Sequence, residues 1–417
     1  MDVKNGYRHP NNWEIVTLGD LFTFKNGLNK GKEHFGYGTP IVNYMDVYKR
    51  SGIRATDLNG RVNLSKQEIK AYEVHKGDVF FTRTSETVDE IGIASVMLDD
   101  PQDTVFSGFL LRARPRNECL DDQFKKYCFA TSEVRKAIIS KSSYTTRALT
   151  NGRLLSSATI PLPSIQEQRA IAAALSDVDV LIAALDRLIA KKRNIKRTAM
   201  QELLTGKKRL PGFSGEWELK KLADCGKFRG GNGFPVKYQG TVDGDYPFFK
   251  VSDMNNKGNS ILMVNSNNWV SRVVKTEIGA TTFPRHSTVF AKIGAAIFLE
   301  RKKILSQESC IDNNMMGYIL DEKIVHYRFI HYIFLNTQLG KLVSTTALPS
   351  LNGREISEIE HYIPKVEEQI AIATILSDME EEISALEQKR DKTRYIKQGM
   401  MQELLTGRIR LVKGVEA

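Results

Sequence analysis

Cationic and aromatic side chains in polar loops are the residues of this chain that could do chemistry. They fall among Gly, Asn, Ser and Thr in two separate regions of the sequence. Arg and Lys beside hydroxyl and amide groups are the side chains that anchor phosphates and read base edges, so we predict that they bind nucleic acid. In the first region they are Lys25, Lys30, Lys32, Tyr44, Arg83, Tyr144, Arg147 and Arg153, and in the second Arg229, Lys237, Lys250, Arg285, Lys292 and Arg354.

The overall charge points to the same kind of partner. The 417 residues include 60 basic and 49 acidic side chains, a net charge of +11 that favours a polyanion. Many basic proteins do not bind nucleic acid, and any one of these cations could be a solvated surface charge. The prediction therefore rests on the group and on its place in loops.

The sequence lacks the motifs of the enzymes that a basic protein of this size could be. It has no G-x-x-x-x-G-K-[ST], no Asp/Asn-Pro-Pro-Tyr/Phe run and no H-E-x-x-H, and the cluster Gly230, Gly231 and Gly233 lacks the spacing of a phosphate cradle. His326 and His331 are five residues apart, which is no ligand pair on a helix face. We predict no catalytic residue and no metal site, and a chain that is not itself an enzyme.

Cysteine usage and hydropathy place the chain in a reducing, aqueous compartment. Four cysteines lie far apart without a C-x-x-C pair, so buried free thiols are expected rather than disulfides or zinc. The start MDVKNGYRHPNN has no apolar signal core, and the most apolar stretch, 171–190, is interrupted by three aspartates. We predict a cytoplasmic protein with no membrane partner.

A duplicated segment must position these loops. Residues 163–210 return at 364–411, an offset of 201 residues without a gap, with about half of the positions identical and MQELLTG intact in both copies. This offset is domain-sized, far above the ~20–50 residues of a solenoid repeat. The chain should therefore consist of two similar halves.

Each copy has the apolar period of a long coiled-coil helix. Roughly forty helical residues would span about 60 Å. Ser164 with Glu167 forms a capping-box pattern at the first start, and Gly206 and Gly407 stand where a helix would end. We expect the two helices to pair with each other along a seam of Ile171, Leu175, Val178, Ile182, Leu185, Ile189, Ile372, Leu376, Met379, Ile383 and Leu386.

The remaining sequence predicts two mixed α/β globules, of the α+β kind. Both regions combine short β-branched and aromatic runs with Gly, Asn and Asp turns, and neither has long βαβ alternation. Landmarks persist between them, among them the run 78–83 against 287–292 and Asn-Gly-Arg at 151–153 and 352–354. We divide the chain into globular regions 1–161 and 213–362, and helical spacer repeats 162–212 and 363–417.

The whole chain resembles the DNA specificity subunit of type I restriction-modification systems. The resemblance is carried by the doubled P-x-x-x-E-Q-x-A-I-A at 163–172 and 364–373, each followed by Leu-Ser-Asp, and by the basic exit at 205–213 that leads to Gly-Glu-Trp217. It implies two target recognition domains, a pseudo-twofold internal repeat and an antiparallel coiled coil between the domains, with each domain reading one half of a bipartite site in the major groove.

The resemblance also implies partners and cofactors that this chain does not carry. Two modification subunits would dock on the helices, bind S-adenosylmethionine and methylate a flipped-out adenine at N6. Restriction subunits would bring ATP and Mg²⁺. Since the two globular fillings differ, the full site should be asymmetric, with its gap related to helix length.

Three alternatives stay open from the sequence. One is a nuclease or methyltransferase whose motif is too degenerate to recognise. Another is a coiled-coil adaptor with no DNA role. The last is a specificity subunit that serves a different restriction class with the same recognition module.

Overall fold

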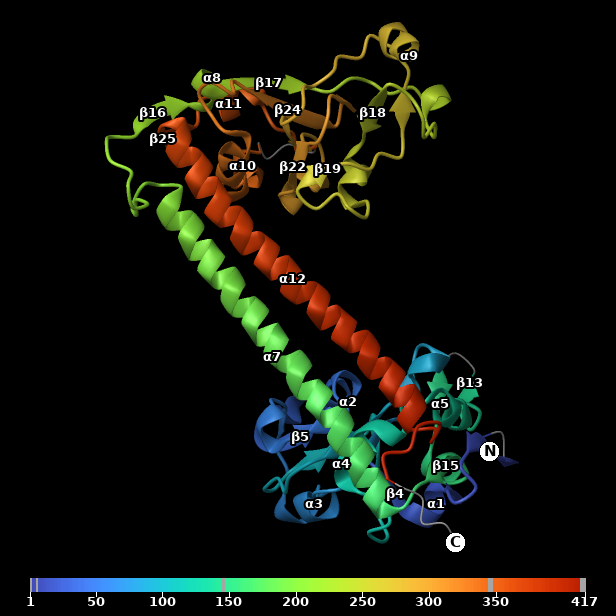
Figure 1. Ribbon diagram of the computed structural model, residues 1–417. Helices are drawn as coiled ribbons and strands as arrows, with labels where there is room; N and C mark the ends of the chain where they lie inside the picture. The colour runs from blue at the N-terminus through green and yellow to red at the C-terminus, as the bar shows by residue number, and fades with distance from the viewer. Residues whose placement is uncertain (1, 5–6, 145–146, 344–347, 413–417) are drawn as a thin grey trace. The chain divides into compact units, whose positions relative to one another are not determined.

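The computed structural model describes residues 2–4, 7–144, 147–343 and 348–412. It divides into two compact units: unit 1 comprises residues 1–186 and 388–417, and unit 2 comprises residues 187–387. Each unit mixes helices with small sheets and contains part of each of two long helices, labelled α7 and α12 in Figure 1. The predicted mixed fold with two similar halves is therefore confirmed.

Unit 1 is built on a five-stranded sheet in the order β4-β12-β8-β10-β6. The neighbouring pairs are antiparallel except β10 with β6, which is parallel. The central strand β8 has the sequence Val-Phe-Phe-Thr and is buried throughout, as β-branched and aromatic residues favour. The five strands are β4 (Phe22–Asn26), β12 (Leu110–Pro115), β8 (Val79–Thr82), β10 (Ala94–Met97) and β6 (Gly52–Ile53).

Smaller sheets and short helices surround this sheet. The small sheets have the orders β11-β5-β7, β13-β14-β9, β15-β3 and β1-β2. Their strands are β1 (Asp2–Lys4), β2 (Tyr7–His9), β3 (Glu14–Thr17), β5 (Phe35–Val42), β7 (Arg61–Val62), β9 (Thr84–Ser85), β11 (Val105–Phe106), β13 (Ser143–Tyr144), β14 (Ala148–Leu149) and β15 (Thr159–Leu162). The helices are α1 (Leu18–Leu21), α2 (Tyr44–Lys49), α3 (Lys66–Ala71), α4 (Asp122–Cys128), α5 (Ser132–Ile139) and α6 (Gly152–Ser156).

Unit 2 repeats this plan. Its main sheet has the order β17-β24-β21-β22-β19, again with only the last pair parallel, and Phe290 pairs with Met316 as Phe81 pairs with Leu111 in unit 1. The strands are β16 (Glu218–Lys221), β17 (Gly226–Gly230), β18 (Tyr246–Phe249), β19 (Leu262–Met263), β20 (Trp269–Val270), β21 (Thr288–Ala291), β22 (Lys302–Leu305), β23 (Cys310–Ile311), β24 (Met315–Leu320) and β25 (Glu360–Ile363). The helices are α8 (Leu222–Cys225), α9 (Arg272–Glu277), α10 (Tyr327–Asn336) and α11 (Gly353–Ser357).

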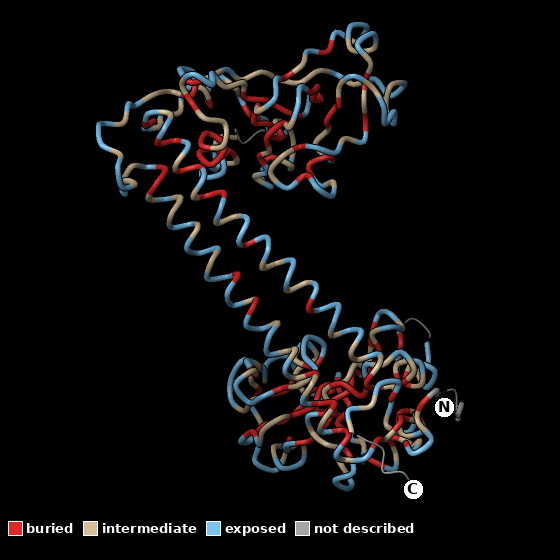
Figure 2. The backbone as a smooth tube through the Cα atoms, in the orientation of Figure 1, coloured by how far each residue is buried: buried red, intermediate tan, exposed pale blue. Residues whose placement is uncertain are grey.

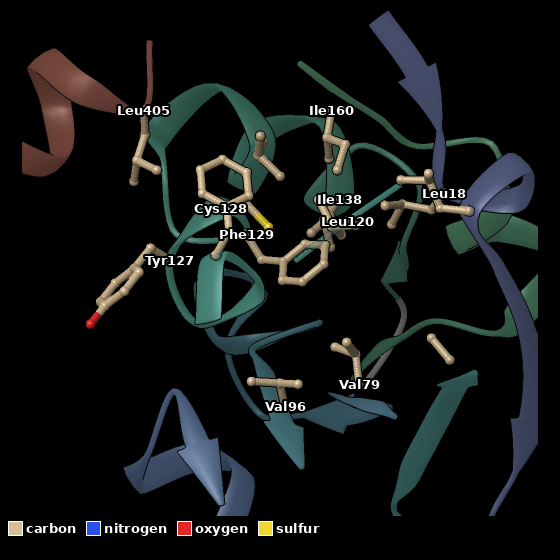
Figure 3. Packing of buried hydrophobic residues seen from close by; sticks show 14 of the residues in the cluster. Leu18, Val79, Val96, Leu120, Tyr127, Cys128, Phe129, Ile138, Ile160 and Leu405 are labelled. Atoms are coloured by element: carbon tan, nitrogen blue, oxygen red, sulfur yellow. The ribbon is translucent and has the colours of Figure 1, made fainter. Parts of the chain in front are cut away.

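The core of each unit needs both long helices. In unit 1, Figure 3 shows Val79 and Val96 of the sheet, Phe129 and Ile138, and Leu405 gathered in one buried cluster. That cluster also takes in Ile171 and Leu175 from the start of α7. The unit 2 core has the corresponding contributions, from Leu203 at the end of α7 and Leu204 just after it, and from Ile372 and Leu376 at the start of α12.

The long helices α7 (Ile165–Leu203) and α12 (Val366–Leu404) each contain 39 residues and run antiparallel. In unit 1, Lys397 Nζ lies 2.6 Å from Asp179 Oδ1. In unit 2, the equivalent Lys196 Nζ lies 3.2 Å from Glu380 Oε2. A second pair in each unit gives the direction: Asp186 pairs with Arg390 in unit 1, and Lys192 pairs with Glu382 in unit 2. In each unit, therefore, the residue that lies later in α7 pairs with the residue that lies earlier in α12, and the two helices are antiparallel.

The residues predicted to form the seam between the helices are the ones that are buried or half-buried. Figure 2 shows buried positions at intervals along both of them, with exposed positions between. Ile171, Leu175, Leu185, Ile189, Ile372, Leu376 and Ile383 are buried, and Val178, Ile182, Met379 and Leu386 are half-buried. This intermittent burial is what a period of about 3.5 residues produces when one face of a helix is covered.

The helix ends match the glycine prediction, but the predicted capping box is half wrong. Gly206 and Gly407 both have φ +69°, the left-handed conformation that terminates a helix. At the start of α7, the Ser164 hydroxyl accepts from the Glu167 N–H at 3.4 Å. The Glu167 carboxylate does not return to Ser164, because it is bonded to residues far along the chain.

That carboxylate forms the centre of a three-residue clamp in unit 1. The Trp13 indole N–H donates to Glu167 at 2.9 Å, and the Arg410 guanidinium donates to both oxygens of the same carboxylate. Glu167 is 1% exposed. The clamp therefore ties the first strand region, the start of α7 and the segment after α12 through one buried charge.

Unit 2 contains the same clamp with the same chemistry. Trp217 donates to Glu368 at 3.2 Å, and Arg209 donates to both oxygens of Glu368 at 2.7 Å. Both arginines also lie over the indole of their clamp, Arg209 at 5.5 Å and Arg410 at 5.9 Å from the ring. The basic segments after MQELLTG thus close the globules.

The other repeated residues fix the helix starts to the globules. The Gln168 amide accepts from the Asp121 N–H and donates to the Cys119 carbonyl, and Gln369 bonds His326 and Ile324 in the same way. About two helical turns later, Ser176 and Ser377 bond the hydroxyls of Tyr127 and Tyr332. Burial raises the pKa of Tyr332 to about 12, so its hydroxyl stays protonated and donates to Glu380.

Replacing Glu368 with Ala should destabilise unit 2 by about 2–4 kcal/mol, because breaking a buried ion pair strands the remaining charge and Arg209 keeps some access to water. The matched control is Glu218→Ala, whose carboxylate pairs with Lys220 at the surface and is 73% exposed. That change should stay within about 0.5 kcal/mol of the parent. Urea unfolding measures both, and equal stability of the two variants would contradict the role of the clamp.

Candidate nucleic-acid interface

In each unit, a cationic residue directly follows the central strand of the main sheet and is held there by backbone hydrogen bonds. Arg83 follows β8, and its N–H donates to the Phe109 carbonyl at 3.0 Å while its own carbonyl accepts from Thr150. In unit 2, Lys292 follows β21 and donates in the same way to Asn314 at 2.7 Å. The backbone position is therefore the same in both units, although the side chains differ.

The residues that bond the Arg83 and Lys292 carbonyls, Thr150 and Leu351, directly precede the repeated Asn-Gly-Arg sequence, with which helices α6 and α11 begin. Asn151 caps α6 by accepting from the Leu154 N–H at 3.0 Å, and Asn352 caps α11 by accepting from the Arg354 N–H at 3.0 Å. Arg153 and Arg354 lie in the first turn of these helices and are exposed. Within the described residues, neither guanidinium has an ion pair or a hydrogen bond, so both are free to meet an external anion.

A third pair of cations lies on equivalent edge strands of the main sheets, β4 in unit 1 and β17 in unit 2. The Lys25 ammonium donates to the Ala71 carbonyl and lies 5.1 Å from the Tyr72 ring. The Arg229 guanidinium donates to the Thr282 carbonyl and lies 4.3 Å from the Phe283 ring. Both cations therefore hold an internal loop, and only their remaining N–H groups could serve a ligand.

In unit 2 these cations line one open hollow of about 470 Å³. Arg229, Lys227 and Arg354 contribute positive charge to its wall, and Phe228 and Met316 give it apolar surface. Gly230 belongs to the same lining, and a Cβ added there would lie 3.3 Å from the Lys292 ammonium. The hollow thus brings together two predicted DNA-binding residues of unit 2, Arg229 and Arg354, and the Lys292 ammonium lies beside Gly230 of its wall.

Other predicted residues of unit 1 occupy separate loops. Lys30 forms an ion pair with Glu68 at 2.5 Å, and Lys32 is exposed. Arg147 lies 3.8 Å from Glu86 with both side chains largely exposed, and Tyr144 is 59% exposed. Tyr44 stacks on Tyr48 with ring centres 5.9 Å apart, and burial raises the pKa of the Tyr44 hydroxyl.

The remaining predicted residues of unit 2 are also spread over its surface. Lys237 pairs with Glu277 at 3.1 Å, and the Lys250 ammonium donates to Gln239 at 2.9 Å. Arg285 is exposed at a turn before β21. The structure therefore gathers Arg83 with the Arg153 helix in unit 1 and the hollow cations in unit 2, and leaves the others as individual surface charges.

The sequence prediction missed Lys227 and Phe109. Lys227 belongs to a short strand in which alternate residues face outward, so its place in the hollow depends on strand register. Phe109 is 62% exposed. In the run Phe-Ser-Gly-Phe-Leu-Leu it has the pattern of a buried strand residue, and only the turn reveals its exposure.

The described part of the chain offers little for catalysis. No group of three or more His, Cys, Asp and Glu side chains is placed there to hold a metal ion. Burial raises the pKa of the Cys225 and Cys310 thiols to about 11, so both remain protonated near neutral pH and are poor nucleophiles. None of the described helices combines the length and apolarity needed to cross a bilayer.

Comparisons with known proteins agree with this duplicated architecture. The family described as type I restriction modification DNA specificity domain matches residues 10–192 and, a second time, residues 214–393. The type I restriction enzyme specificity subunits MjaX and MjaVIII of Methanocaldococcus jannaschii are 23% and 22% identical to this chain. Those alignments cover 96% and 98% of this chain and 95% of each relative.

A solved structure has a similar fold over nearly the whole length. The type I restriction-modification S subunit from M. genitalium superposes with a TM-score of 0.55 at 14% identity, covering 97% of this chain and 98% of that one. At this identity the likeness concerns the fold alone. Because both halves match the family, the chain belongs to the type I restriction-modification DNA specificity family and is a non-catalytic DNA-recognition subunit, as its doubled helix motif predicted.

Proposed function

We propose that this chain reads an asymmetric, bipartite site on double-stranded DNA, with one half-site for each globular region, 1–161 and 213–362. The observation that carries the proposal is the shared backbone frame around Arg83 and Lys292, in which the same positions hold different side chains. Equivalent frames would dock on DNA in the same way. Different side chains would then read different bases.

Within each globular region, we assign different roles in DNA binding to different residues according to the contacts that they make. The free guanidinium groups of Arg153 and Arg354 anchor phosphates, which gives affinity without sequence information. Lys25 and Arg229 hold their own loops while adding positive potential beside those arginines. Residues at the loop tips face the base edges.

We further propose that the long helices dock two modification subunits, which bring S-adenosylmethionine and methylate adenine, and that restriction subunits bring ATP and Mg²⁺. The relatives are named as specificity subunits of restriction enzymes, which supports such an assembly. Another similar structure, at a TM-score of 0.60 and 15% identity, is described in terms of the complex assembly of a type I restriction-modification system. We place the assembly in the cytoplasm, with the chromosome.

Exchange of residues 13–161 for the equivalent region of another family member should change one half of the methylated sequence and leave the other half intact. The reciprocal exchange of residues 213–362 should change only the second half. Methylation-sensitive sequencing of cells that carry each hybrid with the parental modification subunits measures this. A hybrid in which both halves change would refute separate reading.

Arg153→Ala and Arg354→Ala should each weaken DNA binding and lower the slope of log affinity against log salt by about one, because each removes one phosphate contact. Thermal stability should not change, since neither side chain has a hydrogen bond or an ion pair within the part of the chain that the structure describes. Lys323→Ala is the matched control, because this exposed cation follows the opposite end of β24. Unchanged affinity and slope in both arginine variants would rule out their role.

A further inference from the structure

Phe109 occupies a fixed turn at the edge of the candidate interface. The turn 107–110 is closed by the Leu110 N–H, which donates to the Ser107 carbonyl at 2.9 Å. The Ser107 hydroxyl accepts from the Phe109 N–H at 3.4 Å, and the Gly108 N–H donates to the Leu28 carbonyl at 2.7 Å. The turn therefore holds its backbone without any help from the Phe109 ring.

The turn also lies against the end of β4 too closely for a side chain. A Cβ added to Gly27 would lie 2.0 Å from the Ser107 carbonyl oxygen, and one added to Gly108 would lie 1.9 Å from Asn29 Oδ1. Close packing of backbone on backbone fixes the turn in place. The 62% exposed ring of Phe109 is thus presented from a rigid support.

Unit 2 builds the same turn from different residues. The Met315 N–H donates to the Asp312 carbonyl at 3.0 Å, and Asp312 Oδ1 accepts from the Asn314 N–H at 3.0 Å. A Cβ added to Gly231 would lie 2.0 Å from the Asp312 carbonyl oxygen, as at Gly27 in unit 1. Asn314 therefore stands at the position of Phe109.

The chemistry of the two tips differs while their cationic neighbours correspond. The Phe109 carbonyl accepts from Arg83, and the Asn314 carbonyl accepts from Lys292. An amide such as Asn314 can donate to and accept from a base edge, whereas a phenyl ring can do neither. The apolar group that a base presents in the major groove is the C5 methyl of thymine.

We propose that Phe109 is a specificity-determining residue that packs against the C5 methyl of a thymine in the half-site read by unit 1. This inference rests on the proposed function, since it needs unit 1 to face DNA. The Arg83 N–H donates to the Phe109 carbonyl, so the turn that carries the ring adjoins one of the predicted DNA-binding residues. The contact selects thymine because cytosine lacks the methyl group at this position.

The test uses the full chain assembled with its modification subunits and a duplex that carries the methylated sequence. Each thymine of both half-sites is replaced in turn by deoxyuridine, which removes only the C5 methyl. In the parent, one substitution in the unit 1 half-site should weaken binding about fourfold, the loss expected for one buried methyl group. In Phe109→Ala that substitution should have no further effect, and Phe109→Leu should retain part of it.

Asn314→Ala is the matched control, and it should keep the deoxyuridine effect of the unit 1 half-site unchanged. The proposal is overturned if that half-site contains no thymine, if no deoxyuridine there weakens binding by the parent, or if Phe109→Ala remains equally sensitive. Failure of the proposed function has a separate signature, because the parent assembly would then fail to prefer the methylated sequence over a scrambled duplex.

Discussion

Two buried carboxylates hold this architecture together. Glu167 and Glu368 are almost inaccessible to water, and each is neutralised by an arginine and bonded by a tryptophan. A buried carboxylate without such partners would cost several kcal/mol, so the three groups of each clamp must assemble together. Each globule is thus complete only when it holds the start of one long helix and the exit of the other.

This constraint explains why the repeat is preserved where it is. The glutamate, the following glutamine and the serine two turns later all bond the globule beside them, in both copies. Substitution of any of them would leave a buried polar group unsatisfied. Arg83 and Lys292 are positioned differently, because their backbone N–H groups donate to the Phe109 and Asn314 carbonyls and these bonds do not depend on the identity of the side chain. The scaffold is fixed by side chains, while the reading surface is fixed by backbone and remains free to vary.

The sequence predicted the features that depend on local pattern. Helix period, the terminating glycines and the mixed globules follow from residue spacing, and the structure confirms them. The role of Glu167 did not follow, because its partners Trp13 and Arg410 lie 154 and 243 residues away along the chain. From the sequence alone, Glu167 could be interpreted only through its neighbour Ser164, as part of a local capping box.

The candidate interface was predictable in kind but not in geometry. Loop cations suggested phosphate contacts, yet the carbonyls and rings that engage Lys25 and Arg229 are brought near only by tertiary folding. Phe109 looked like a core residue because exposure is set by a turn that the alternation of residues does not encode. The doubled Asn-Gly-Arg was the sequence signal that did locate the exposed arginines.

The proposed function requires that this chain alone choose the DNA sequence for the modification subunits. Methylome sequencing of the host, with and without the gene for this chain, tests it most directly. We expect one asymmetric motif of two short halves separated by unspecified bases, methylated only when the chain is present. A palindromic or uninterrupted motif, or one that persists without the chain, would contradict it.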